Sequence, residues 1–292
     1  MPGSSVTPAR ASVHRLLSLV AVATLAWGGC SGTGKNAGSE HPSPGILYQN
    51  DFDDDTTGIY SLENLRADWR NPRSEDGVSE GRVSLVEGEG AFSGKSLRVT
   101  YPAGVVGTRG GARWHLTLEP GHRELYCAYR VRFGEGFGFV RGGKLPGLAG
   151  GEANTGGRKP DGSDGWSSRM MWRREGRAVQ YVYHPDQPGI YGQDFPYDLG
   201  GSRAFEPGRW HQVEHRVVVN TPGRTDGIIQ AWFDGELALS VNGLRFRDTS
   251  DFAIDSFLFS TFFGGSGPEW APARDETITF DEFVISTDPL SH

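Results

Sequence analysis

The sequence predicts an all-β fold in which two sheets pack as a jelly-roll sandwich. From Ile46 onward, short runs alternate between apolar and polar residues and are separated by Gly, Pro and Asp. No long stretch shows the apolar spacing of a helix. Hydrophobic residues make up 36% and aromatic residues 11% of the 292 residues. That is enough for the core of a sandwich and argues against disorder in this part of the chain.

Eleven runs are predicted as strands, a number and spacing that suit two packed sheets. They are residues 82–85, 96–101, 113–118, 125–133, 167–173, 179–184, 211–220, 227–233, 236–241, 254–263 and 277–286. The dipeptide Asp234-Gly235 predicts a two-residue hairpin, because Gly accepts the positive φ of a type I′ turn. The glycine-rich segments 102–111 and 142–165 are predicted as loops, and the second is long enough to be functional or mobile.

Residues 1–30 are predicted to be a bacterial lipoprotein signal peptide. Arg10 and Arg15 precede an apolar run over residues 16–26, which is the order of an export signal. The run is too short to span a bilayer stably. Cys30 follows the run and two glycines, and this resembles a lipobox, whose cysteine is lipidated. Trp27 departs from that pattern, so an ordinary signal peptide with an incidental cysteine stays an alternative.

The chain after Cys30 divides into a tether and one domain. Residues 31–45 are rich in Gly, Ser and Pro and nearly free of apolar residues, which predicts a flexible tether. Residues 46–292 are predicted to form one β-jelly-roll domain. We expect an exported monomer that is held to the outer membrane or cell surface by its lipid.

Charge and cysteine content exclude several classes of partner and cofactor. The net charge of −7 argues against nucleic acid, although an anionic sugar needs only a locally basic groove. Cys127 is the one cysteine of the domain, so no disulfide is expected, and a small buried hydrophobe is favoured over a nucleophile. No His or Cys spacing indicates a catalytic metal. The acidic run 51–55 fits either a structural calcium site or, preferably, a surface turn.

One predicted hairpin carries a hydroxyl, a guanidinium and two phenols on a single face. If residues 174–176 form a three-residue loop that ends in a left-handed glycine, Arg169 faces Tyr181 and Ser167 faces Tyr183. A two-residue loop would instead put Arg169 and Tyr181 on opposite faces.

Two further residues belong to the same prediction. Strand parity turns Ser168, the competing serine, towards the core and adds Arg173 to the polar face. Lys144 follows two glycines and precedes Leu-Pro, so we expect it on an extended loop, presented rather than buried.

These groups match the requirements of β-elimination from a uronic acid. The proton to be removed lies α to a carboxylate, whose charge must be neutralised. Arg169 offers a planar fork for that carboxylate and Lys144 a second positive charge. Tyrosine near two cations serves as base or acid, and the residues leave open which phenol does which. A solvated sheet face or a plain binding surface is the competing interpretation.

Longer stretches of the sequence resemble polysaccharide lyase family 14, the alginate and polyuronate lyases. They lie between about residues 97 and 286 and read RVTYPAG, GGKLPGLAGG, GWSSRMMWR, YVYHP, GRWHQVEHRVVVNTPGRTDG, WFDG, FSTFFGGSGPEWAPARD and FDEFVIS. The resemblance implies a concanavalin-like β-jelly roll and cleavage of an acidic polysaccharide, of the alginate or glucuronan class, into unsaturated oligosaccharides. It also implies an active centre at Lys144, Ser167, Arg169, Tyr181 and Tyr183, and no cofactor.

Other residues have less specific patterns. Arg173 and Trp270 are predicted to bind substrate, although Trp270 fits a core position equally well. His211 and its neighbour Trp210 are expected to pack or orient a strand. A glycoside hydrolase would need paired carboxylates, and Glu214 has no obvious partner. A carbohydrate-binding lipoprotein without turnover is the second alternative.

Overall fold

The computed structural model describes residues 45–290. The predicted signal peptide, Cys30 and the tether up to residue 44 lie outside the described residues. Within the described part, no helix has both the length and the apolar character needed to cross a bilayer.

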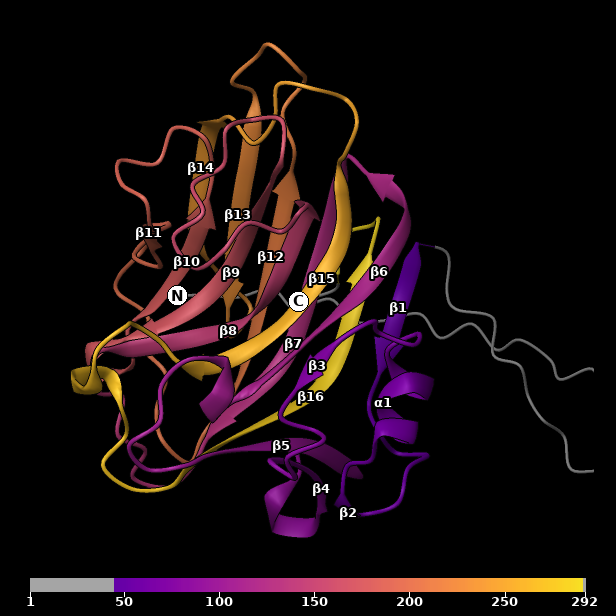
Figure 1. The fold of residues 1–292 in the computed structure, drawn as a ribbon, viewed down its shortest axis with the longest axis vertical. Helices are drawn as coiled ribbons and strands as arrows, with labels where there is room; N and C mark the ends of the chain where they lie inside the picture. The colour runs from indigo at the N-terminus through magenta and orange to yellow at the C-terminus, as the bar shows by residue number, and fades with distance from the viewer. Residues whose placement is uncertain (1–44, 291–292) are drawn as a thin grey trace, which may run out of the picture. The chain divides into compact units, whose positions relative to one another are not determined.

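Two antiparallel sheets form the domain, as predicted. One has seven strands in the order β11-β10-β9-β8-β15-β6-β3 and is nearer the viewer in Figure 1. Their bounds are β3 Glu75–Asp76, β6 Ala112–His122, β8 Gly142–Gly151, β9 Gly165–Arg173, β10 Ala178–Tyr183, β11 Gln193–Pro196 and β15 Ile254–Phe263.

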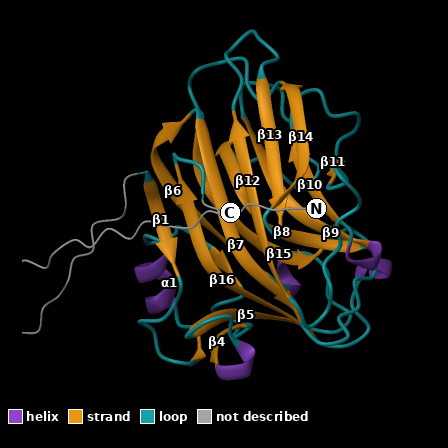
Figure 2. Ribbon diagram, turned by 180° about the vertical axis from the view of Figure 1, so that it is seen from behind, coloured by secondary structure: helices purple, strands orange, loops and turns teal. Residues whose placement is uncertain are grey.

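The other sheet has nine strands and is nearer the viewer in Figure 2, which shows the molecule from behind. Its order is β14-β13-β12-β7-β16-β5-β4-β2, and β1 also pairs with β16. The bounds are β1 Ile46–Asn50, β2 Gly58–Ile59, β4 Val83–Glu87, β5 Lys95–Tyr101, β7 Glu124–Phe133, β12 Trp210–Val218, β13 Gly227–Phe233, β14 Glu236–Leu244 and β16 Glu276–Ser286. The one α-helix of the described residues, α1 (Leu62–Asp68), is capped by Ser61.

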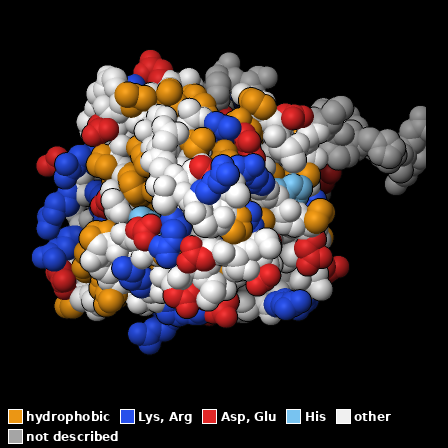
Figure 3. Space-filling model, turned by 90° about the horizontal axis from the view of Figure 1, so that it is seen from above, with side chains coloured by type: hydrophobic (Ala, Val, Ile, Leu, Met, Phe, Trp, Pro, Cys, Tyr) orange, Lys and Arg blue, Asp and Glu red, His pale blue; other side chains and the backbone are white. Residues whose placement is uncertain are grey.

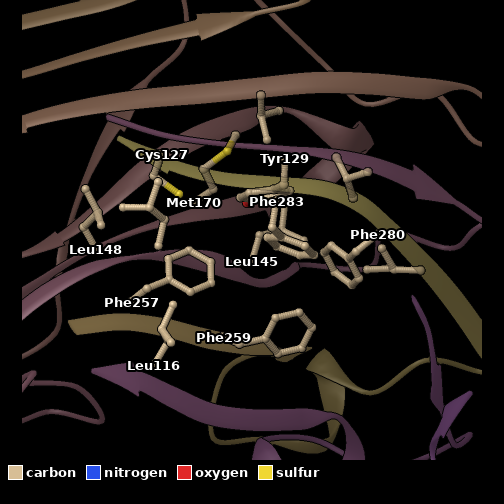
Figure 4. Close-up of a cluster of buried hydrophobic side chains, with 14 of the residues drawn as sticks. Leu116, Cys127, Tyr129, Leu145, Leu148, Met170, Phe257, Phe259, Phe280 and Phe283 are labelled. Atoms are coloured by element: carbon tan, nitrogen blue, oxygen red, sulfur yellow. The ribbon is translucent and has the colours of Figure 1, made fainter. Parts of the chain in front are cut away.

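Aromatic side chains from both sheets fill the space between them. Phe257 and Phe259 of β15 meet Phe280 and Phe283 of β16 in this core (Figure 4). Trp69, which follows α1, is fully buried and stacks on Phe257. Each such ring removes a large apolar area from water, so this layer fixes how the sheets face each other.

All eleven predicted strands are present, and the Asp234-Gly235 hairpin is confirmed. Asp234 and Gly235 have φ of 51° and 82°, as a type I′ turn requires. The hairpin between β9 and β10 is also confirmed. Its three-residue loop, Arg174–Gly176, ends with Gly176 at φ 74°, and Arg169 pairs with Tyr181 across the strands.

The prediction of a loop over residues 142–165 was wrong for its first ten residues, which form β8. This strand lies between β9 and β15 and is buried along nearly its whole length. Its glycines are needed for close packing. A side chain at Gly143 would collide with the ring of Trp172, and one at Gly147 with the backbone of Ser168 and Arg169. The glycine pattern that predicted a loop thus marks a central strand, against which neighbouring side chains and backbone pack closely.

Replacing Gly147 with Ala tests this reason for the glycines. A Cβ there meets backbone atoms that cannot rotate away, so we expect the free energy of unfolding to fall by about 1–3 kcal/mol, measured by urea denaturation. Gly189→Ala is the control, because nothing lies within 4 Å of that position, and should stay within about 0.5 kcal/mol of the wild type. Equal stability of the two variants would contradict this account of β8.

Candidate active site

A cleft of about 560 Å³ opens on the outer face of the seven-stranded sheet. Four of its lining residues are of basic type: Arg113, Lys144, Arg169 and Arg173. No Asp or Glu is among the described residues that line it. Elsewhere the surface mixes both signs, as the face in Figure 3 shows, and the whole chain is acidic. The cleft is therefore a local basic site on an acidic protein.

Lys144 lies in the floor of this cleft, on β8, and is only 9% exposed. Its Nζ is 3.6 Å from the centre of the Tyr181 ring and 2.7 Å from Sδ of Met171. Burial, with the charges of Arg169 and Arg173, holds the pKa of Lys144 well below its usual range. The expectation of a lysine presented on a loop was wrong, because its segment is a strand buried between two others.

Arg169 projects from β9 over the neighbouring strand. It pairs with Gly147 of β8, where a side chain would collide with the backbone of Arg169. Its Nη1 donates to Oγ of Ser260 on β15 at 3.3 Å. Its Nε has no hydrogen-bond partner in the described part of the chain. Burial lowers the pKa of Arg169 to about 10, against the opposing effect of Tyr183 and Tyr181. A buried guanidinium with a free donor is ready to bind an anion.

The two phenols of β10 differ in their surroundings. Tyr181 lines the cleft, and burial and then Tyr183 raise its pKa above the ordinary value. Tyr183 packs edge-on against Tyr181, with ring centroids 5.6 Å apart, and does not line the cleft. Its hydroxyl accepts a hydrogen bond from the N–H of Gly157 at 3.0 Å.

The two adjacent serines of β9 lie on opposite faces, as strand parity predicted. Ser167 pairs with Tyr183 and donates to the carbonyl of Asn154 at 2.7 Å. Ser168 points to the other side, where it accepts from Nε2 of Gln180. Ser167 is fully buried beneath the connection between β8 and β9, so it shares the face of the cleft without lining it.

The two predicted substrate-binding residues stand at the rim. Arg173 makes two hydrogen bonds to Asp194 of β11, at 2.7 and 2.5 Å, and its Cζ is 5.5 Å from the Tyr181 ring centre. Trp270 ends a short 3-10 helix, is half-buried and lines the cleft. A side chain at Gly265 would collide with its ring. Of the two interpretations of Trp270, its place favours the platform over the core.

The remaining sequence predictions concern residues outside the cleft. Cys127 is a free, buried cysteine, as expected. His211 receives the N–H of Glu206 on Nε2 and contacts Asp234 through Nδ1, which orients the start of β12. Glu214 lies on β12, in the other sheet, where burial raises its pKa to about 7.

The described residues contain no group of three or more His, Cys, Asp or Glu side chains placed to hold a metal ion. In the acidic run 51–55, Asp53 accepts from the N–H of Lys95 and Asp55 from Asn64. These bonds tie the run to β5 and to α1. Within the run, the N–H of Asp53 donates to Asp51, a local bond that is typical of a surface turn.

Comparison with known proteins identifies the family. The family model for polysaccharide lyase 14 matches residues 90–283. The chain belongs to polysaccharide lyase family 14. Comparison with curated proteins gives no match.

Solved structures agree with this family. The alginate lyase Aly36B is 28% identical, with a TM-score of 0.72 over 86% of this chain and 100% of its own. A variant of it, with a lysine and a tyrosine replaced by alanine, is solved in complex with an alginate tetrasaccharide. The family 14 alginate lyase from Aplysia kurodai is 27% identical, with a TM-score of 0.69 over 83% of this chain and 99% of its own. These findings support a lyase that acts on a uronic-acid polysaccharide.

A structure with low sequence identity shares the fold of this chain. The endo-β-1,4-glucuronan lyase from the fungus Trichoderma reesei is 16% identical, with a TM-score of 0.52 over 83% of this chain and 96% of its own. At this identity the likeness concerns the β-jelly roll alone.

Sequence reasoning missed several residues of the cleft. Arg113 and Ser260 line it from β6 and β15, and Asp194 of β11 holds Arg173. The alternation in the run 113–118 was a usable signal, because it turns Arg113 away from the core. Nothing in the sequence indicated that β15 lies between β8 and β6 in the same sheet.

Proposed function

We propose that the chain cleaves a uronic-acid polymer of the alginate or glucuronan class by β-elimination in this cleft. The observation that carries the proposal is a cleft lined by three arginines and a lysine and, among the described residues, by no carboxylate. Such a site attracts a polyanion even though the whole protein has a net charge of −7.

Arg169 is proposed to bind the carboxylate of the sugar that reacts. Its guanidinium is 2% exposed, and a charge-assisted hydrogen bond is stronger where water is excluded. Withdrawing charge from the carboxylate makes the proton on the adjacent carbon more acidic and stabilises the enolate-like intermediate.

Lys144 is proposed to take that proton as a neutral amine. Its lowered pKa favours the deprotonated form, which a general base requires. After proton uptake, the ammonium faces the Tyr181 ring at 3.6 Å, a geometry that stabilises a cation. This role replaces the permanent positive charge expected from the sequence.

Tyr181 is proposed to protonate the leaving glycosidic oxygen. It lines the cleft, and its raised pKa keeps the phenol protonated until the leaving group needs the proton. The electrons of the broken C–H bond form a carbon–carbon double bond as the C–O bond breaks. Tyr183 and Ser167, held by Gly157 and Asn154, are proposed to fix the position of Tyr181 and of β9.

The alternatives fit this site less well. A glycoside hydrolase needs two carboxylates facing the bond that breaks, and none of the described residues around the cleft supplies one. A protein that only binds carbohydrate has no need of a buried lysine with a lowered pKa.

Ultraviolet absorbance tests the proposed reaction, because elimination creates a conjugated double bond and hydrolysis does not. Adding polymannuronate, polyguluronate or polyglucuronate to the protein should give rising absorbance with at least one polymer. Lys144→Ala and Tyr181→Phe should each lower kcat by about 10²–10⁴-fold, the usual contribution of a positioned acid or base.

Arg224→Ala serves as the control, since Arg224 is exposed in a turn of the other sheet. It should retain wild-type kcat. Reducing ends without the absorbance change would contradict the lyase, and full activity of either active-site variant would contradict its assigned role.

We also propose that the protein is exported and lipid-anchored through Cys30 to the outer membrane or cell surface. The support is the order of charged run, apolar run and cysteine in residues 1–30. In a bacterial host, the wild-type protein should fractionate with membranes and incorporate labelled fatty acid. Cys30→Ser should lose both properties, and a variant that is still labelled would contradict lipidation at this residue.

A further inference from the structure

A second arginine continues the basic floor of the cleft beyond the reacting centre. Arg113 is on β6 and pairs with Ser260 of β15, the residue that accepts a hydrogen bond from Arg169. The backbone of Arg169 lies in the row of Gly147 and Leu258, and its side chain reaches Ser260, two residues further along β15. The charge of Arg113 is close enough to lower the pKa of Arg169. Two guanidiniums thus border Ser260.

Arg113 forms no ion pair with another residue of the described part of the chain. Asp76 is its pairing partner on β3, yet among residues 45–290 no acidic side chain lies within 4.0 Å of the Arg113 guanidinium. Arg173, at the other end of the cleft, is paired with Asp194. Arg113 and Arg173 differ in this respect. An incoming carboxylate must compete with Asp194 for Arg173, whereas it meets no described ion-pair partner at Arg113.

His115 holds Arg113 in place. It is two residues further along the same face of β6, and its Nε2 is 3.4 Å from Nη2 of Arg113. Burial, Arg113 and Arg169 lower the pKa of His115 to about 4, so the imidazole is neutral near pH 7. A neutral ring nitrogen can accept from the guanidinium without cancelling its charge.

We infer that Arg113 binds the carboxylate of the sugar next to the one that reacts. The inference rests on the proposed function, because a uronate polymer carries one carboxylate on every sugar. From Arg169 on β9 to Arg113 on β6 there are three strand spacings, which place the two backbones about 14 Å apart. Arg169 reaches over β8 to Ser260 of β15, and Arg113 starts from β6, the strand beyond β15. The two guanidiniums can therefore bind separate carboxylates of a chain that crosses the strands.

Steady-state kinetics on substrates of different length test this subsite. On polymer, Arg113→Ala should raise KM at least about tenfold, the effect of losing a charge-assisted hydrogen bond, with kcat within about twofold of the wild type. On oligouronates of increasing length, wild-type KM should drop when the added sugar reaches β6. That drop should vanish in the variant.

Two further variants distinguish binding from misfolding. Arg113→Gln keeps a polar side chain of similar size and should show the same rise in KM with an unchanged unfolding temperature. Arg224→Ala removes one positive charge from the other sheet and should leave KM unchanged. In a Lys144→Ala background, the Kd for a uronate hexasaccharide, measured by calorimetry, should rise by the same factor when Arg113 is replaced.

The outcomes separate the inference from the function on which it rests. If the wild type cleaves a uronate polymer and Arg113→Ala has unchanged KM, the inference is overturned and the lyase stands. A loss of kcat at every substrate length would also overturn it, because Arg113 would then act on the reacting sugar. If the wild type neither cleaves nor binds any uronate polymer, both fail.

Discussion

The site depends on an amine buried among like charges. Lys144 is surrounded by Arg169, Arg173 and the Tyr181 ring, and no carboxylate lines the cleft among the described residues. Burial and repulsion from the two arginines outweigh the attraction of Asp194, so the ammonium form of Lys144 is disfavoured. The lack of a carboxylate among the described residues that line the cleft therefore helps to keep the amine available as a base, and it leaves Arg169 and Arg113 available for an anionic sugar.

The glycine-rich strand β8 makes this arrangement possible. A side chain at Gly147 would collide with the backbone of Ser168 and Arg169 on β9, the strand from which Arg169 reaches Ser260 on β15. Gly143, near Lys144, receives the ring of Trp172 from the core side. Close packing on both faces of one strand thus couples the aromatic core to the position of the cations. A larger residue in β8 would disturb the fold and the site together.

Strand parity made much of the site predictable. Side chains alternate between the two faces of a strand, so Ser167, Arg169 and Arg173 were predicted to share one face. The glycine at the end of the three-residue hairpin loop sets the register that places Tyr181 opposite Arg169. These are local relations within one hairpin, which a sequence encodes directly. The eleven predicted strands have the same origin, because alternation is a local pattern.

The order of strands in a sheet is not local, and there the sequence was insufficient. The glycine-rich sequence of residues 142–151 fits a loop as well as a strand whose glycines allow neighbouring groups to pack closely. The burial of Lys144 and its lowered pKa were therefore not predicted. Arg113 was missed because β6 and β9 are joined through β15 and β8 only in three dimensions.

Titration of Lys144 tests the central claim most directly. NMR of ¹³C-labelled lysine side chains, assigned with the Lys144→Ala variant, should show Lys144 losing its proton well below the reference lysine pKa of about 10.4. Arg169→Met removes one repelling charge and keeps a long, uncharged side chain at this position. The pKa of Lys144 should therefore move back up towards that reference. A Lys144 that titrates at the reference value in the wild type, or one that does not respond to Arg169→Met, would contradict the account.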